Sequence, residues 1–459
     1  MGDEVLFWKV ARGIATGTDF PQLGPQISTG LARHPGPLLY YVMAVPLLVR
    51  DAPEACNAFV AVLGGVSVLL YWSALRPYFG ETGAAMASLL MACMPWSTLY
   101  ADRAWNPNVL GFFVALAFWA ACRTRRIPSR AVVVLLVVSM AAMPHLHMSS
   151  PMVWLALLPI WLPSVRRWRW HWLLLAMTLA LSLYAPMLIH ERATHWSNVL
   201  AFVRESSAGS VDYRRVPLWA FRLLTLDVSY HQLTSYWTRH TEAEMVSFLL
   251  HGNSVFVYGH ARRFLLVLSF EFAALAVGLA VWTAWGGTGK RWPKPFLWAA
   301  LAGITANTAL LLVTHKPIYG HYVQPLLPFY YVAFAELGRW SARHTRRRWA
   351  TWALAVLVCV GGIDVARWVS RRLDARNGLS TVRAVIDAID KDGPDPSFSL
   401  SFGFVGSRDA YQALIAQGPD HHKSLGPGPR YLLLLREAHA PIGARAVLET
   451  GPVTLYRMP

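Results

Sequence analysis

The sequence predicts an all-α polytopic membrane protein with a small α/β domain at its C-terminal end. Of the 459 residues, 55% are hydrophobic, 21 are tryptophan and the mean hydropathy is +0.35, which is too apolar for soluble domains of this total size. The apolar residues fall into about ten runs long enough, or nearly long enough, to cross a bilayer. Roughly the last 90 residues, the usual size of a small domain, lack this pattern.

The expected membrane helices follow one another from residue 55 onward. A helix needs roughly 20 mostly apolar residues to cross the hydrocarbon core, and somewhat fewer where flanking residues snorkel. Runs that meet or approach this length are centred in 55–76, 83–99, 108–122, 131–147, 151–164, 172–189, 264–285, 295–314, 321–338 and 349–368. The run 38–49 is too short and contains Pro46, so we expect an interfacial helix there. The chain then divides into residues 1–50, a bundle over 51–368 and a domain over 369–459.

Alternate loops between these runs differ in charge. One set carries the basic clusters, which are Arg76; Arg123, Arg125, Arg126 and Arg130; Arg166, Arg167 and Arg169; Lys290, Arg291 and Lys294; and Arg339, Arg343, Arg346, Arg347 and Arg348. The opposite short loops hold only Arg103 and Lys316. The positive-inside rule places the first set in the cytoplasm, and residues 1–50 therefore on the outer side. Because nothing in 1–50 could carry the chain across a membrane, we expect that a helix preceding Met1 is missing from the sequence as given.

Three regions are thus expected outside: 1–50, a loop over 190–262 and the domain 369–459. The loop holds four histidines without the spacing of a metal site, namely His231, His240, His251 and His260. In the last domain, Thr381 to Lys391 has helical periodicity. Three segments resemble strands separated by Gly/Pro turns such as 426–429, and these are Phe398–Phe402, Tyr431–Leu435 and Ala446–Tyr456.

Composition also argues against two kinds of site. The net charge of +17 would indicate a nucleic-acid partner only if the basic residues formed a face or stripe on a folded domain, and here they are spread between apolar runs. The cysteines all lie in apolar segments, so neither a disulfide framework nor a cysteine metal site is expected; they are Cys56, Cys93, Cys122 and Cys359.

An acidic pair, Asp3 and Glu4, stands near the start of the chain. Charged side chains near the hydrocarbon boundary are costly, which makes them functional candidates. A carboxylate placed where an acceptor hydroxyl or amine meets an activated sugar can act as general base in an in-line displacement. On the dipeptide alone, the structural alternative of a solvated acidic pair stays open.

The next outer loop, Tyr100 to Asn108, holds Asp102, Arg103 and Asn106 between two spans. Capping of the following helix explains its Asn-Pro-Asn part. It does not explain the adjacent acid and base. These residues therefore stay candidates for function.

Two later segments carry polar side chains at outer helix ends. His145 and His147, spaced i and i+2, do not share a helix face, so we expect no zinc site, although one of them can line a cavity. Lys316 lies close in sequence to Tyr319 and His321, a combination that suits a phosphate or pyrophosphate group. The structural alternatives are histidines satisfied by backbone groups and a lysine that snorkels through an aromatic belt.

Together these pieces resemble the lipid-linked sugar transferases of the GT-C fold, and most closely glycosyltransferase family 39, which includes protein O-mannosyltransferases and the aminoarabinose transferases that act on lipid A. Asp3-Glu4 stands where that family carries an acidic pair in its first outer loop. The segment His34–Tyr41 resembles the family's basic, proline-containing motif, in which lysine is common at the position of His34. Asn106 stands where relatives often have an acid, and the His-Tyr-x-x-Pro segment at 321–325 is also similar.

The resemblance implies a GT-C-like helical bundle and an inverting transfer of sugar from a polyprenyl-phosphate donor to an extracytoplasmic protein, lipid or glycan. Asp3 would be the general base, supported by Glu4. The donor phosphate would contact Arg33, His34, Arg103 and Lys316, and the substrate cavity would include Asp102, Asn106, His145, His147, Tyr319 and His321. No metal ligand, cofactor or nucleic-acid partner is implied. The location would be a bacterial inner (plasma) membrane, with the active site on its periplasmic face.

Two other readings stay open. A lipid or polysaccharide transporter would show repeated halves and broken helices with charges near the membrane midplane, neither of which the sequence indicates. A relative that binds polyprenyl lipid without catalysis is compatible with the substitution at Asn106.

The charge pattern generates a prediction about sidedness. A cysteine introduced beside Asp3 in a cysteine-free background should react with an impermeant thiol reagent in intact cells, because residues 1–50 are expected outside. Labelling measured before and after membrane disruption checks this. Reaction only in disrupted cells would place the acidic pair in the cytoplasm.

Overall fold

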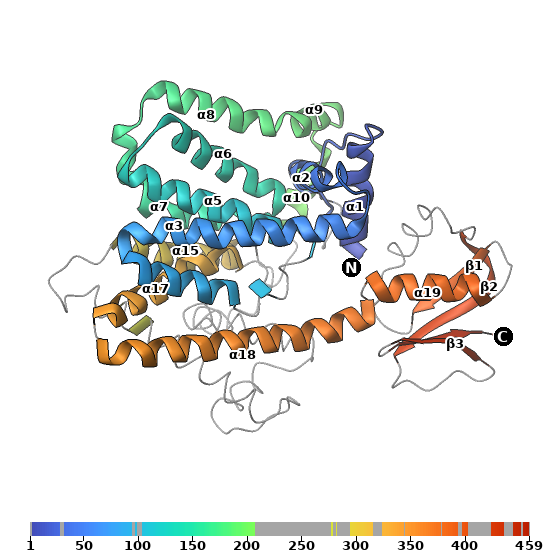
Figure 1. Cartoon of the computed structure of the whole chain (residues 1–459). Coiled ribbons are helices and arrows are strands. Elements are labelled where there is room, and N and C mark those ends of the chain that lie inside the picture. The colour runs from blue at the N-terminus through green and yellow to red at the C-terminus, as the bar shows by residue number, and fades with distance from the viewer. Residues whose placement is uncertain are drawn as a thin grey trace. The chain divides into compact units, whose positions relative to one another are not determined.

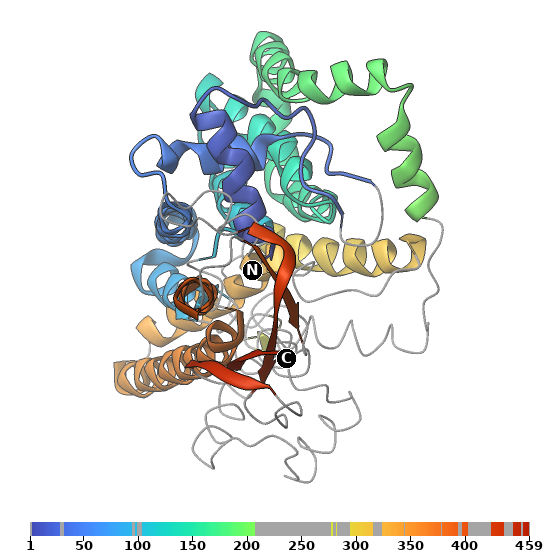
Figure 2. The same ribbon diagram turned by 90° about the vertical axis from the view of Figure 1, so that its right-hand side faces the viewer.

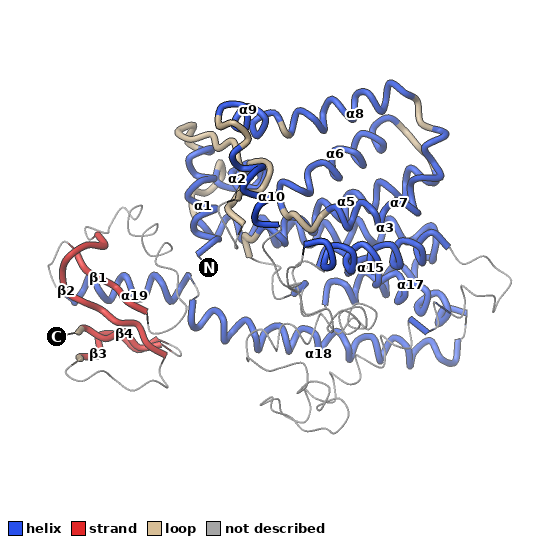
Figure 3. The backbone as a smooth tube through the Cα atoms, turned by 180° about the vertical axis from the view of Figure 1, so that it is seen from behind, coloured by secondary structure: helices blue, strands red, loops and turns tan. Residues whose placement is uncertain are grey.

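The computed structural model is mostly helical, with a small sheet near the C-terminus (Figures 1 and 3). It describes residues 2–27, 32–93, 97–98, 103–206, 277–278, 281, 294–314, 324–343, 345–377, 379–392, 397–402, 424–435, 444–450 and 453–458. The chain forms two compact units. The bundle unit comprises 21–42 and 57–366, and the terminal unit comprises 1–20, 43–56 and 367–459. The division into 1–50, 51–368 and 369–459 stays a prediction.

Helices occupy most of the apolar runs expected to cross the membrane. They are α2 (Leu38–Leu47), α3 (Pro53–Cys93), α5 (Asn106–Arg126), α6 (Arg130–Leu146), α7 (Pro151–Trp161) with the 3₁₀ turn η1 (Leu162–Arg167), α8 (Trp170–Leu183), α9 (Ala185–Ala193), α10 (Ser197–Ser206), α15 (Lys294–Thr314), the 3₁₀ turn η3 (Gln324–Leu326), α17 (Leu327–Arg343) and α18 (Thr345–Asn377). The expected run 264–285 lies almost wholly outside the described residues. The helical fold class is confirmed.

Two of the helices are broken. The expected span 55–76 and residues 83–93 of the expected span 83–99 are helical in α3. They meet at Gly80, whose φ of 73° is non-helical, so the expected loop 77–82 shrinks to a kink. The expected span 172–189 is two helices, α8 and α9, bent by 48° at Tyr184. Pro186, in the first turn of α9, explains this second break, which the expected single span overlooked.

Length and apolar composition test the membrane assignment directly. Within the described residues, α3 and α5 are each long and apolar enough to cross a bilayer, and α8 with α9 makes a third candidate if the bent pair forms one span. Helices α2 and α6 are apolar but shorter. The chain therefore has helices suited to a membrane, while the number of about ten spans stays a prediction.

Aromatic side chains fill the interior of the bundle unit around α5. The ring of Phe118, fully buried, lies 5.1 Å from Tyr71, 5.6 Å from Phe329 and 6.0 Å from Phe296. These rings come from α3, α17 and α15, so one side chain of α5 contacts three other helices. Lipid chains are as apolar as these rings, so close packing, and not removal from water, holds such helices together.

Arginines cap the helix ends at one end of the bundle unit. The last carbonyls of a helix lack partners within it, and a guanidinium can bond several of them. Arg167 donates to the carbonyl of Thr124 (3.3 Å), in the last turn of α5, and Arg125 donates to the carbonyl of Ile160 (3.2 Å) near the end of α7. Two of the loops predicted to be cytoplasmic therefore touch each other.

Other predicted cytoplasmic segments reach the same end. Tyr78, beside the kink of α3, donates to the carbonyl of Cys122 (3.0 Å), and its ring lies 5.0 Å from Phe296 at the start of α15. Arg339 of α17 lies 6.0 Å from the centre of the Phe79 ring. Within the described residues, helix ends that flank all five basic clusters thus meet at one end, which we call the basic end; Lys290 and Arg291 themselves lie outside the described residues.

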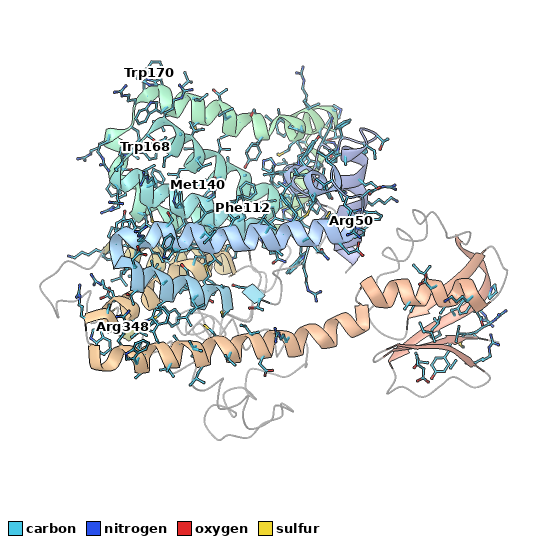
Figure 4. The ribbon with its side chains drawn as sticks, viewed as in Figure 1. Arg50, Phe112, Met140, Trp168, Trp170 and Arg348 are labelled. Carbon is cyan, nitrogen blue, oxygen red and sulfur yellow. The ribbon has the colours of Figure 1, made fainter. Side chains whose placement is uncertain are left out.

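Figure 4 shows the basic end directly. Trp168, just after η1, and Trp170, the first residue of α8, lie at the same end of the bundle unit as Arg348, in the first turn of α18. Trp170 is 74% exposed, as expected of an indole at a membrane interface. The loop alternation read from charge therefore agrees with the packing of the helices.

The terminal unit contains the helix α1 (Gly2–Ala15) and an α/β part. That part consists of α19 (Leu379–Asp392), β1 (Ser397–Phe402), β2 (Ser424–Leu435), β3 (Arg445–Thr450) and β4 (Val453–Arg457). The strand order is β1-β2-β4-β3, with β1 parallel to β2 and the other pairs antiparallel (Figure 3). The small C-terminal α/β domain expected from the sequence is confirmed.

Two details of the sheet differ from expectation. The expected single strand Ala446–Tyr456 is the pair β3 and β4. The Gly/Pro segment 426–429, expected as a turn, lies within β2, where the pairing with β1 jumps from Leu425 to Arg430. Proline has no N–H to donate to a ladder, so the segment passes along the strand without pairing to β1.

Asp392, the last residue of α19, holds this helix to the sheet. Its carboxylate is 6% exposed, accepts a hydrogen bond from the hydroxyl of Tyr431 (2.9 Å) and pairs with Arg457 (3.0 Å) and Arg445. A buried carboxylate with three partners on three strands is strongly coupled to the fold.

Replacing this carboxylate should loosen the α/β part. We expect Asp392→Asn to lower its free energy of unfolding by about 2 kcal/mol, because charge-assisted bonds to both arginines are lost. Asp387→Asn, an exposed carboxylate on the same helix, is the matched control. Limited proteolysis during heating measures the difference, and equal cleavage temperatures for the two variants would contradict it.

Candidate functional site

The end of the bundle unit opposite the basic end carries a segment of extended chain that ends at His34. Gly24 donates its backbone N–H to the carbonyl of His34 (3.0 Å), and His34 donates its own to the carbonyl of Pro25 (2.9 Å). A Cβ on Gly24 would lie 2.8 Å from the Cβ of His34 and 2.6 Å from the carbonyl oxygen of Gly36. Only glycine at position 24 therefore lets these two segments of the chain approach this closely.

The side chain of His34 is buried and uncharged. It is 6% exposed, and its ring centre lies 6.0 Å from that of His147. Burial lowers the pKa of His34 to about 4, against a smaller opposing effect of a hydrogen bond with the backbone of Pro144. At neutral pH this imidazole is a hydrogen-bonding group and carries no charge.

His145 and His147 meet in the same place because α6 ends between them. Side chains at i and i+2 would point to different helix faces, but His147 is already extended, with φ −158° and ψ 133°. His145 is 1% exposed, and its ring meets that of Tyr184 edge-on at 4.4 Å. A Cβ on Gly36 would lie 1.9 Å from its Nδ1. We call His34, His145 and His147 the histidine cluster.

Asn106 joins the start of α5 to the cluster. Its side chain is buried and donates to the carbonyl of Leu146 (2.8 Å), the last residue of α6. Just before α5, the carbonyl of Arg103 accepts a hydrogen bond from the side chain of Asn108 (3.0 Å). The loop that carries Arg103 is thus tied to the first turn of the helix whose Asn106 borders the cluster.

Several buried polar atoms here have no hydrogen-bond partner within the described part of the chain. They are Nδ1 of His34, both ring nitrogens of His145 and the hydroxyl of Ser150. An unsatisfied buried polar atom costs about 1–3 kcal/mol, so such a group is suited to a ligand that presents several oxygens or hydroxyls. Among the described residues no set of three or more ligating side chains could hold a metal ion.

Three residues of this region were missed by sequence reasoning. They are Tyr184, Glu191, which is fully buried, and Asn198, which is 9% exposed. The charged triplet 190–192, directly after an apolar run, was a signal for Glu191. Nothing in the sequence indicated Asn198, because its partner lies 165 residues away.

The structure describes the other predicted site residues only in part. Arg33 has an exposed side chain. Asp3 and Glu4 lie in the first turn of α1, in the terminal unit, and the structure describes only their backbone. Four predicted site residues lie outside the described residues, namely Asp102, Lys316, Tyr319 and His321. Their roles stay predictions.

Comparison with known proteins gives structural similarity at low identity. The crystal structure of ArnT from Cupriavidus metallidurans bound to undecaprenyl phosphate has 14% identity and a TM-score of 0.44, covering 99% of this chain and 93% of that chain. Its apo form has 15% identity, the same coverage and a TM-score of 0.45. The Archaeoglobus fulgidus oligosaccharyltransferase tethered with an acceptor peptide has 12% identity and a TM-score of 0.45, covering 92% of this chain and 60% of that chain. Neither a protein-family model nor a curated protein matches the chain. The specific likeness to family 39 stays a prediction.

The low pKa of His34 predicts how stability depends on pH. The unfolded chain protonates this side chain near pH 6.5, and the folded protein does so only near pH 4. Between these values the unfolded state binds more protons, so the free energy of unfolding falls as pH falls, by about 3 kcal/mol in all. Above pH 6.5, His34 is uncharged in both the folded and the unfolded state, so this loss of stability is absent.

Melting temperatures of the solubilised protein at about pH 7 and pH 5 measure this effect. His34→Gln should lose less stability on acidification than the wild type, because the buried imidazole is gone. His171→Gln, which removes an exposed histidine at the basic end, should behave as the wild type. An identical pH response of His34→Gln and the wild type would show that His34 is not the titrating group.

Proposed function

We propose that this protein is an integral membrane glycosyltransferase that moves a sugar from a polyprenyl-phosphate donor to an extracytoplasmic acceptor, with inversion. A lipid donor suits a chain whose polar residues gather at the ends of apolar helices. The observation that carries the proposal is the histidine cluster, a buried group of uncharged hydrogen-bonding side chains at the end opposite the arginines. Its unsatisfied atoms are suited to the hydroxyl and phosphoryl oxygens of a sugar phosphate.

The departing lipid phosphate needs groups that stabilise its negative charge. Preorganised donors in a water-poor site do this well, because they need no reorganisation during the reaction. In the proposal, the positive charge comes from Arg33, Arg103 and Lys316. His34, uncharged in the folded protein, would bond a phosphate oxygen, and a bound dianion would favour its protonation.

The acceptor needs a base. Asp3 would remove the proton of the acceptor hydroxyl or amine as it attacks the anomeric carbon, with Glu4 in support. His145 and His147, with Asn106, Asp102, Tyr319 and His321, would contact sugar or acceptor. The proton passes to the carboxylate, and the lipid phosphate leaves with the bonding electron pair of the cleaved C–O bond.

One observation favours a second candidate, a relative that binds the lipid-linked sugar without transferring it. The amide group of Asn106, at the position where the resembling family often has an acid, already bonds Leu146. That bond gives Asn106 a structural role between α5 and α6. An assay with labelled polyprenyl-phosphate sugar separates the two functions, since both proteins would bind the donor but only an enzyme would consume it.

The proposal predicts the behaviour of an Asp3→Asn variant. Transfer from labelled polyprenyl-phosphate sugar by the protein in lipid nanodiscs should fall by about 100-fold or more, the usual contribution of a general base. Donor binding should persist, because the phosphate contacts are unchanged.

Asp19→Asn is the matched control, since it makes the same chemical change at an exposed position shortly after α1. It should retain wild-type transfer. Full activity of Asp3→Asn would remove Asp3 from the mechanism, and donor binding without turnover by the wild type would favour the non-catalytic function.

A further inference from the structure

The side chain of Asn198 forms two hydrogen bonds with the backbone of one distant residue. Its Oδ1 accepts from the N–H of Arg33 at 2.6 Å, and its Nδ2 donates to the carbonyl of Arg33 at 3.2 Å. The amide thus pairs with Arg33 as a neighbouring strand would. Asn198 is 9% exposed, so water competes little for these bonds.

The Arg33–His34 segment is therefore held from two sides. The backbone of His34 bonds Gly24 and Pro25, and that of Arg33 bonds Asn198. Adjacent residues of an extended chain point in opposite directions. This explains why Arg33 is exposed while His34 is buried in the histidine cluster.

The turn that presents Asn198 is conformationally unusual. The turn joins α9 to α10 in the green part of the ribbon in Figure 2. Within it, His195 and Trp196 both have positive φ, 53° and 63°. Residues other than glycine seldom adopt this region, and such strain persists only where surrounding contacts fix it. Here the backbone carbonyl of Glu191 accepts the N–H of Trp196 (2.8 Å), and its buried carboxylate accepts that of Val199 (3.5 Å).

We propose that Asn198 is a positioning residue of the candidate site, which clamps the backbone of Arg33 and thereby fixes the direction of both Arg33 and His34. Glu191 and the strained turn hold Asn198 in place. The clamp rests on observed contacts, whereas its value for sugar transfer rests on the proposed function. The clamp couples the turn after α9 to the Arg33–His34 segment, so a displacement of the turn would release that segment.

Chemical modification of His34 tests the clamp without any assay of transfer. Diethylpyrocarbonate modifies accessible uncharged imidazoles, and trypsin releases His34 in the peptide 34–50, where it is the only histidine. In Asn198→Ala, we expect His34 to react about tenfold faster than in the wild type, because two hydrogen bonds that hold its segment are lost.

The matched control is Asn57→Ala. Asn57 also bonds a distant backbone group, the N–H of Ala104 at 2.9 Å, but it holds a different loop. Its loss should leave the His34 rate unchanged. Asn198→Asp keeps an acceptor for Arg33 N–H and loses the donor, so it should react at an intermediate rate.

A wild-type rate for His34 in folded Asn198→Ala would overturn the proposal. If Asn198→Ala does not fold, Asn198→Asp serves as the test. A wild-type rate of His34 modification in Asn198→Asp would then overturn the proposal equally.

Kinetics connect the clamp to the reaction. If the proposed function is right, Asn198→Ala should raise the KM for the lipid donor about tenfold with kcat largely retained, because a binding segment is displaced while the base is untouched. Asn198→Asp should restore part of the donor affinity. A faster His34 reaction with no transfer in any variant, the wild type included, supports the clamp and counts against the proposed function alone.

Discussion

The hydrocarbon interior of a membrane leaves no water for unpaired polar groups, and this constraint organises the bundle unit. Helices satisfy their own backbone except at their ends, so polar chemistry is confined to the two ends of the bundle. The ends solve the problem differently. At the basic end, Arg125 and Arg167 bond the last carbonyls of α7 and α5. At the other end, uncharged groups take this role: Asn106 bonds the carbonyl of Leu146, and His34 bonds the backbone of Pro144.

This difference has consequences for chemistry. Exposed arginines at the basic end suit water and lipid headgroups, where charge is well tolerated. The histidine cluster is shielded, and in such surroundings electrostatic interactions are stronger than in water. An uncharged His34 can gain a proton when an anion arrives, so binding and protonation are linked there. A site of this kind favours ligands that bring negative charge and hydrogen-bonding oxygens together.

Much of the fold could be predicted from the sequence because its signals are local. Apolar runs located the helices, and arginine clusters located the basic end. The histidines were found as candidates, but their meeting depends on where α6 ends, which Pro144 and the following residues decide through tertiary contacts. The pairing of Asn198 with Arg33 spans 165 residues and leaves no local pattern. The passage of residues 426–429 through β2 was equally hidden, since it depends on pairing with β1, whereas Pro186 is a local cause of the break at Tyr184.

The two glycines beside the cluster, Gly24 and Gly36, have an evolutionary consequence. A methyl group at either position would collide with His34, Gly36 or His145, whatever the protein binds. The imidazoles, by contrast, can change as a substrate changes. Among divergent relatives, we therefore expect Gly24 and Gly36 to be retained longer than the side chains that recognise the ligand. The two glycines would then identify this backbone arrangement even where the ligand specificity has changed.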